Sequence, residues 1–194
     1  YSQRLIEGES IGTFYGPEYE GLRSSGSIKV TQTNEKEWVK LGNAYPICDL
    51  GWSNNVKLWD FSLSATFRAS IGGKAFNQMR AVYESVNEFG LKNVLASWLD
   101  EPEFTGRVVY CSKYLEDASF LKLDNLTLAY NVPLKNRKVV KSLSFSLTGQ
   151  NLFTLTAYKG VDPEVSRSGL TPGIEGLSYY PRTRVFTFGA SIKF

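Results

Sequence analysis

The sequence of 194 residues has no histidine and only two cysteines. The absence of histidine excludes a Ser-His-Asp triad and most zinc sites, and it removes the side chain that most often senses physiological pH. Cys48 and Cys111 are too far apart for a CxxC redox or zinc motif. They could pair in an oxidising compartment or stay as separate thiols, because the sequence does not fix their Cβ geometry. We therefore predict no metal site and no cofactor.

Long apolar runs and charge of one sign are also scarce. No run of 18 apolar residues occurs, so a transmembrane helix is excluded, whereas a β-barrel is not, because only half of each barrel strand is apolar. The net charge is +3, and the one basic cluster is typical of a solvated turn, so we expect no nucleic-acid partner. The cluster consists of Lys135, Arg137, Lys138 and Lys141. The chain begins at Tyr1 without an initiator methionine or a signal peptide, so we expect a processed chain or a fragment.

What the sequence does contain is strict alternation in residues 184–194. Apolar side chains alternate there with small or polar ones, which is the side-chain period of a β-strand. The apolar members are Phe186, Phe188, Ala190, Ile192 and Phe194. In an outer-membrane β-barrel, such a strand points its apolar side chains to lipid and its polar side chains to the lumen. We interpret the segment as the closing strand of a barrel of this kind.

The length of a second alternating row, from Trp59 to Ile71, favours a barrel over a soluble sheet. Strands of soluble domains usually run to about 5–6 residues. This row covers about 13 residues, or about 40 Å at roughly 3.3 Å per residue. Tilted by about 40°, it rises roughly 30 Å, the thickness of a bilayer core. A soluble β-sandwich explains the alternation but not the length.

Five strands are predicted in all, with alternating short and long connections between them. They span residues 47–57, 60–72, part of 114–132, 140–156 and the terminal segment, and residues 5–15 and 26–33 supply one or two more. The long connections are 73–113, which contains helical spacing, and 157–182. Short turns alternating with long loops are typical of a transmembrane barrel, with the short turns in the periplasm. The loop 73–113 is either a short helix packed in an external loop or a ligand-binding lid.

Five to seven strands cannot close a transmembrane barrel, for which about eight is the smallest number. An open edge in lipid would leave backbone groups unpaired. The predicted fold class is therefore all-β, an antiparallel transmembrane β-barrel meander that forms part of a larger barrel.

Several segments resemble the C-terminal part of the SusC/RagA family of TonB-dependent outer-membrane transporters. Residues 114–130 read YLEDASFLKLDNLTLAY, close to the family's YLEDGSYLRLKNLTLGY, and residues 149–154 read GQNLFT as the family does. Residues 160–165 read GVDPEV beside GYDPEV, and residues 180–189 read YPRTRVFTFG beside YPQARTFSFG. Residues 41–46 and 71–77 also echo family motifs. Ala118 and Ala129 stand where the family often has glycine.

The resemblance implies that residues 1–194 are C-terminal strands and external loops of a barrel of about 22 strands. It also implies location in the bacterial outer membrane, import of glycans or peptides with energy transmitted by TonB, and a SusD-like surface lipoprotein as partner. The TonB contact would lie in an N-terminal region outside this chain. In such proteins the assembly machinery recognises an alternating segment ending in an aromatic residue, which assigns this role to Phe186, Phe188, Ile192 and Phe194.

Candidate ligand contacts come from external aromatics and from lumen-facing polar side chains. Trp98, Tyr179 and Tyr180 could stack on sugar rings or simply pack within loops, and Arg68 and Gln150 could contact substrate or only line a wetted wall. The competing function is a soluble carbohydrate-binding β-sandwich. Asp162 and Glu164 flank Pro163, but without histidine we predict no catalytic residues and no enzyme.

Overall fold

The structure, a computed structural model, describes residues 3–86, 89–134, 139–165 and 169–194. The chain divides into two compact units. The sheet unit comprises Cys48–Ser70, Phe120–Thr156 and Arg182–Phe194, and the loop unit comprises Tyr1–Ile47, Ile71–Ser119 and Ala157–Pro181. Within the described ranges, no helix is long and apolar enough to cross a membrane.

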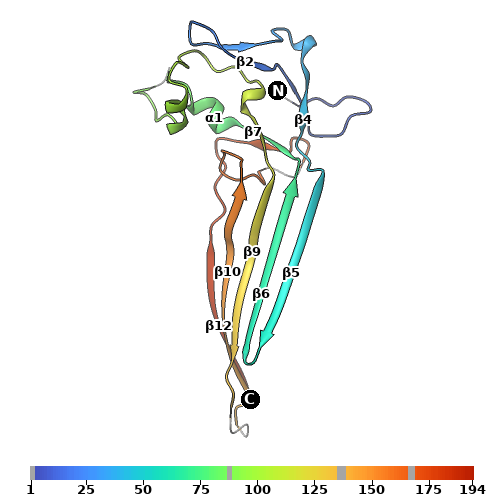
Figure 1. The fold of residues 1–194 in the computed structure, drawn as a ribbon, viewed down its shortest axis with the longest axis vertical. Helices are drawn as coiled ribbons and strands as arrows, with labels where there is room; N and C mark the ends of the chain where they lie inside the picture. The colour runs from blue at the N-terminus through green and yellow to red at the C-terminus, as the bar shows by residue number, and fades with distance from the viewer. Residues whose placement is uncertain (1–2, 87–88, 135–138, 166–168) are drawn as a thin grey trace. The chain divides into compact units, whose positions relative to one another are not determined.

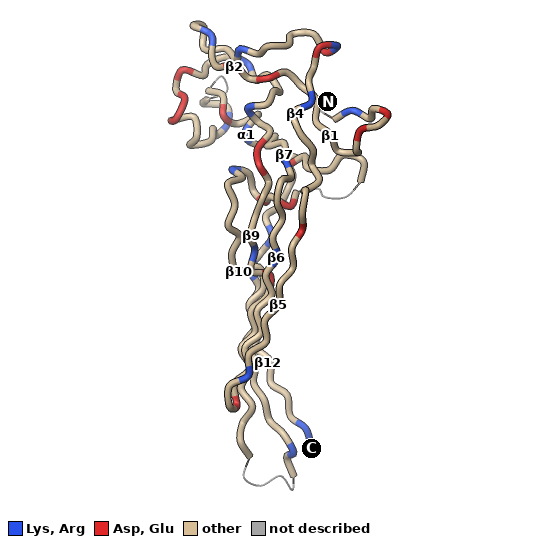
Figure 2. The backbone as a smooth tube through the Cα atoms, turned by 45° about the vertical axis from the view of Figure 1, so that its right-hand side comes forward, with Lys and Arg blue, Asp and Glu red and all other residues tan. Residues whose placement is uncertain are grey.

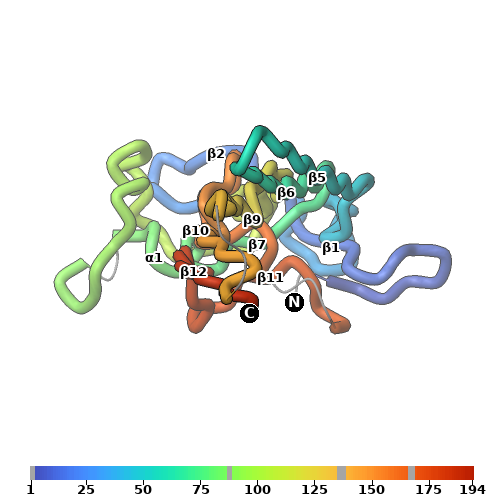
Figure 3. The backbone as a smooth tube through the Cα atoms, turned by 90° about the horizontal axis from the view of Figure 1, so that it is seen from below, coloured from blue at the N-terminus to red at the C-terminus, as the bar shows by residue number. Residues whose placement is uncertain are grey.

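The sheet unit is one five-stranded sheet in the order β12-β10-β9-β6-β5 (Figures 1 and 3). Its strands are β5 Cys48–Leu58, β6 Phe61–Ile71, β9 Phe120–Asn131, β10 Ser142–Thr156 and β12 Val185–Lys193. The pairings β6–β9, β9–β10 and β10–β12 are all antiparallel. The five predicted strands and the meander are therefore confirmed, and the terminal strand pairs with the preceding long strand, as a meander requires.

One sequence-based expectation, the start of the second strand, needs correction in detail. Trp59, predicted to begin the apolar row, lies in the two-residue connection between β5 and β6, with a left-handed φ of 52°. Strand β6 therefore has 11 residues, which at roughly 3.3 Å each and a tilt of about 40° still rises about 28 Å. The strand predicted within 114–132 is confirmed as β9, and the short strand β8 (Leu115–Asp117) before it belongs to a different sheet.

Residues 5–15 and 26–33 supply only short strands, which do not join the long sheet. They contain β1 (Thr13–Gly16) and β3 (Ile28–Val30). Strand β1 pairs with β4 (Val39–Asn43), and β3 pairs with β2 (Tyr19–Leu22). Strands of three to five residues reach at most about 17 Å, too little to cross a bilayer.

The remainder of the loop unit is a small sheet with short helices. Strand β7 (Lys74–Asn77) lies between β11 (Ile174–Glu175), which is parallel to it, and β8, which is antiparallel. The helices that lie wholly in described residues are α1 Gln78–Tyr83 and the 3₁₀ turns Glu35–Glu37, Ala96–Asp100 and Ser112–Tyr114. The predicted short helix in 73–113 is thus present, and Asn77 caps it by accepting a 2.8 Å hydrogen bond from the Arg80 amide.

The two units differ in where their apolar side chains lie: buried in the loop unit and largely exposed on the long strands. The loop unit has a core of buried apolar side chains, among them Phe14, Ile28, Phe76, Phe104 and Tyr114. The five long strands carry few charged residues over most of their length, as Figure 2 shows. Of the predicted basic cluster, Lys135, Arg137 and Lys138 lie outside the described residues.

Candidate functional site

One face of the long sheet is a continuous exposed apolar surface. Leu63, Leu128, Leu147 and Phe188 are cross-strand partners in one row over four strands. They remain 43%, 45%, 52% and 71% exposed, so no second sheet of the described residues covers them as a β-sandwich would require. Exposed apolar side chains on this scale cost free energy in water, and a lipid phase removes that cost.

The opposite face of the same sheet carries hydroxyl groups. Ser64, Thr127, Thr148 and Thr187 form the neighbouring row over the same four strands. The Thr127 and Thr148 hydroxyls lie 2.9 Å apart, and those of Ser53 and Thr66 lie 3.1 Å apart. Small hydroxyl side chains hydrogen-bond to each other or to water. This face therefore suits a wetted wall.

A β-bulge places an ion pair on the hydroxyl face. The register of β6 against β9 shifts between Thr66 and Phe67, so Asp124 is an extra residue of β9. Its carboxylate accepts hydrogen bonds from Arg68 Nε at 2.8 Å and from a terminal guanidinium nitrogen at 3.2 Å. Both side chains are about a third exposed, so the pair contributes at most about 1 kcal/mol. Its main effect is to hold the Arg68 guanidinium in one place.

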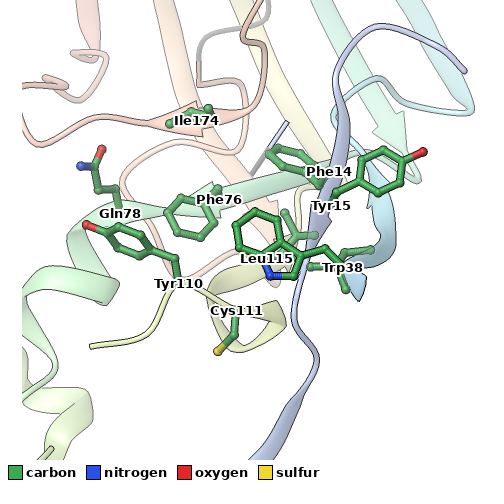
Figure 4. A pocket seen from close by; sticks show the side chains of 11 residues that line it. Phe14, Tyr15, Trp38, Phe76, Gln78, Tyr110, Cys111, Leu115 and Ile174 are labelled. Carbon is green, nitrogen blue, oxygen red and sulfur yellow. The ribbon is translucent and has the colours of Figure 1, made fainter. Parts of the chain in front are cut away.

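The loop unit contains a pocket of about 100 Å³ lined mainly by aromatic rings (Figure 4). Its walls come from five separate parts of the chain. The lining residues include Phe14, Tyr15, Trp38, Phe76, Gln78, Tyr110, Cys111, Leu115 and Ile174. The rings of Phe76 and Tyr110 meet edge to face, with centroids 5.5 Å apart. This pocket could not be predicted from the sequence, because no periodic signal connects residues so far apart.

Metal binding finds no support in the described part of the chain. No group of three or more His, Cys, Asp or Glu side chains there could hold a metal ion. Cys48 is exposed and Cys111 buried, and both are free thiols. Burial raises the pKa of the Cys111 thiol, which keeps it neutral.

The sequence of the chain is similar to those of known TonB-dependent receptors. No protein-family profile matches the chain. It is 30% identical over 154 residues to the TonB-dependent receptor SusC of Bacteroides thetaiotaomicron, covering 75% of this chain and 15% of SusC. It is 27% identical over 234 residues to the TonB-dependent receptor P3 of Formosa agariphila, covering 100% of this chain and 23% of that receptor. The chain belongs to the SusC/RagA family of TonB-dependent receptors.

A solved structure supports the barrel fold of this receptor segment. The structure of the RagAB peptide transporter matches 100% of the chain and 24% of the transporter chain, with a TM-score of 0.79 and 23% identity. A second RagAB structure, of the peptide importer in its open-open state, matches with a TM-score of 0.77. The chain therefore spans about a quarter of the structures and receptors that it matches over its whole length. The predicted fold class, part of a larger antiparallel barrel, is confirmed.

The predicted ligand contacts of the receptor segment come from both units. Arg68 and Gln150 lie in the sheet unit, whereas Trp98, Tyr179 and Tyr180 lie in the loop unit. Tyr180 is 78% exposed, and the Tyr179 hydroxyl lies 3.5 Å from Asp162 Oδ2. A ligand role for these five residues stays a prediction.

The predicted assembly residues lie on an open sheet edge. Strand β12 pairs with β10 along one side and has no second partner strand among the described residues. Phe186, Phe188, Ile192 and Phe194 are all exposed. This geometry suits capture by strand addition, and the assembly role stays a prediction.

The loop unit also holds a fully buried carboxyl group, Glu175. Its Oε2 accepts hydrogen bonds from the Tyr158 hydroxyl at 2.9 Å and from the Val161 amide at 2.8 Å. Its Oε1 has no hydrogen-bond partner among the described residues. A Cβ at Gly160 would lie 2.3 Å from Glu175 Oε2, so the chain needs glycine for this close approach. Burial raises the pKa of Glu175, and hydrogen bonds from Val161, Tyr158 and the Asp162 backbone oppose that rise only in part.

This raised pKa predicts that Glu175 makes the loop unit more stable in acid. A carboxyl whose folded pKa lies above its unfolded pKa stabilises the fold fully below the unfolded value, and this contribution is lost as the pH rises through the folded pKa. We expect Glu175→Gln in the complete receptor to protect the loop unit at about pH 8 but to change little at about pH 4. Hydrogen exchange of residues 157–165 and 174–181 at both pH values measures this. An equal effect of the substitution at both values would contradict the prediction.

Proposed function

We propose that this chain forms part of the barrel wall and external loops of an outer-membrane nutrient importer. The main evidence for this proposal is the five-stranded sheet, which has an exposed apolar row on one face and a hydroxyl row on the other. A wall between lipid and water needs both faces. Residues 1–194 act together in this role, in which the long strands span the membrane and the loop unit supplies external loops.

The imported nutrients are glycans or peptides, and the energy comes through TonB. The names of the matched proteins support this proposal, because they are TonB-dependent receptors and a peptide transporter. A SusD-like lipoprotein is the proposed partner, supported by the match to SusC and to RagAB. The same names and the absence of histidine support a non-enzymatic role. The hydroxyl face, with Arg68 and Gln150, lines the wetted interior.

Depletion of nutrients from the growth medium tests this function for many candidate substrates at once. Wild-type cells, cells lacking the receptor gene and cells lacking TonB activity are grown on a mixture of oligosaccharides and peptides. Mass spectrometry of the medium then follows each compound. We expect at least one class of glycan or peptide to remain in the medium of both mutants. Identical depletion by wild-type cells and the receptor mutant would overturn the proposal.

A further inference from the structure

The aromatic pocket of the loop unit is partly formed by the packed core of that unit. Phe14 and Phe76 belong to the buried core of the unit, so two of its walls are fixed by packing. Tyr110 contacts Phe76 edge to face but is 53% exposed, which places it at the rim. Arg4 lies over the Trp38 ring, 4.8 Å from its centroid, and holds a third wall. A pre-formed pocket loses little conformational entropy when a ligand enters.

The volume of the pocket limits the size of its occupant. A dry cavity of about 150 Å³ lined by Leu, Ile and Phe accepts benzene in another protein. This pocket has about 100 Å³, so it fits a branched aliphatic group better than an aromatic or sugar ring. Carbon atoms dominate its walls, and the buried Cys111 thiol adds no charge. A sugar would bury hydroxyl groups here without enough hydrogen-bond partners.

Two polar groups on the lining match the backbone of a peptide. The side-chain amide of Gln78 and the hydroxyl of Tyr110 make no hydrogen bond to any described residue. An amide side chain both donates and accepts hydrogen bonds, as a peptide group does. An apolar pocket with a few convergent polar groups is the usual form of a small-ligand site.

We propose that this pocket binds the branched aliphatic side chain of a peptide, with Gln78 and Tyr110 contacting the peptide backbone. This deepens the proposed function, on which it rests, by selecting peptides over glycans. Leu115 and Ile174 supply aliphatic contacts from β8 and β11, and Figure 4 shows both side chains among the residues that line the pocket.

Binding of small probes to the complete receptor tests the proposal. The receptor is held in lipid nanodiscs, because free detergent tails would compete for an apolar pocket. The probes are N-acetyl-leucine-N-methylamide, its aspartate counterpart and maltose, each followed by saturation-transfer NMR. We expect binding of the leucine probe alone. No binding of that probe, or stronger binding of maltose that depends on Tyr110, would overturn the proposal.

Comparing the affinities of matched variants for the leucine probe tests whether the probe binds in the pocket. Tyr110→Ala removes a rim ring and should weaken leucine-probe binding at least about tenfold. Tyr45→Ala is the same change at another partly exposed tyrosine of the loop unit, outside the pocket, and should bind as the wild type does. Gln78→Leu keeps the volume but removes the amide, and should also weaken binding. Equal affinity in the Tyr110 variant and the wild type would overturn the proposal.

The two proposals fail in distinguishable ways. Unchanged nutrient depletion in cells lacking the receptor overturns the import function, whatever the pocket binds. If nutrient depletion is normal and TonB-dependent but the receptor does not bind the leucine probe, only the pocket proposal is overturned.

Discussion

Replacing Leu147 by arginine is expected to lower the free energy of unfolding of the complete receptor by about 2–4 kcal/mol. Leu147 is 52% exposed on the apolar face, between its cross-strand partners Leu128 and Phe188. It is well inside the 15-residue strand β10, so an arginine there would place a charge against hydrocarbon. Denaturant titration of the receptor in lipid vesicles, followed by tryptophan fluorescence, measures the change.

Ser146 provides the matched control for this substitution. It is the adjacent residue of β10 and belongs to the opposite face, where its partners Ala129 and Gly189 are small. Ser146→Arg therefore has room and faces water, and should cost much less than Leu147→Arg. Equal losses at the two positions would refute the assignment of lipid and lumen faces.

Replacing Phe194 by aspartate in the full-length protein is expected to reduce its amount in the outer membrane several-fold and to leave chain in the periplasm. Phe194 follows β12, whose other apolar side chains are exposed and whose outer edge is open among the described residues. An edge strand with apolar side chains is a template for strand addition, and a charge at its end would weaken that capture. Cell fractionation with quantitative immunoblotting measures the distribution.

Lys193→Ser is the control for the assembly prediction. Lys193 is paired with Ser142 in the register of β10 and β12, in the polar phase of the alternation. Its backbone carbonyl accepts a 2.7 Å hydrogen bond from the Lys141 amide, which the substitution keeps. We expect near-normal assembly of this variant. If the Phe194 variant assembles equally well, the aromatic side chain is ordinary packing and not a signal.

Much of the sheet could be predicted because its signals are local. Period-two alternation in 184–194 and in Phe61–Ile71 depends only on the side of the strand to which each residue points, and it predicted correctly which residues share a face. The same reasoning extended β6 into Trp59, because alternation does not reveal a turn that one positive φ makes possible. Short strands such as β1 and β3 were located only loosely, because three or four residues carry too little pattern.

By itself, the sequence determined the fold class, the two faces of the long strands, their order and the family of this receptor segment. Only the tertiary structure decided which distant residues meet. The bulge at Asp124 breaks the alternation and brings its carboxylate to Arg68, and the close approach at Gly160 lets Glu175 be buried beside Tyr158. The pocket, too, joins β1, β7, β8 and β11. Such contacts depend on how long loops pack against each other. Loop packing produces no periodic pattern in the sequence, whereas a strand does.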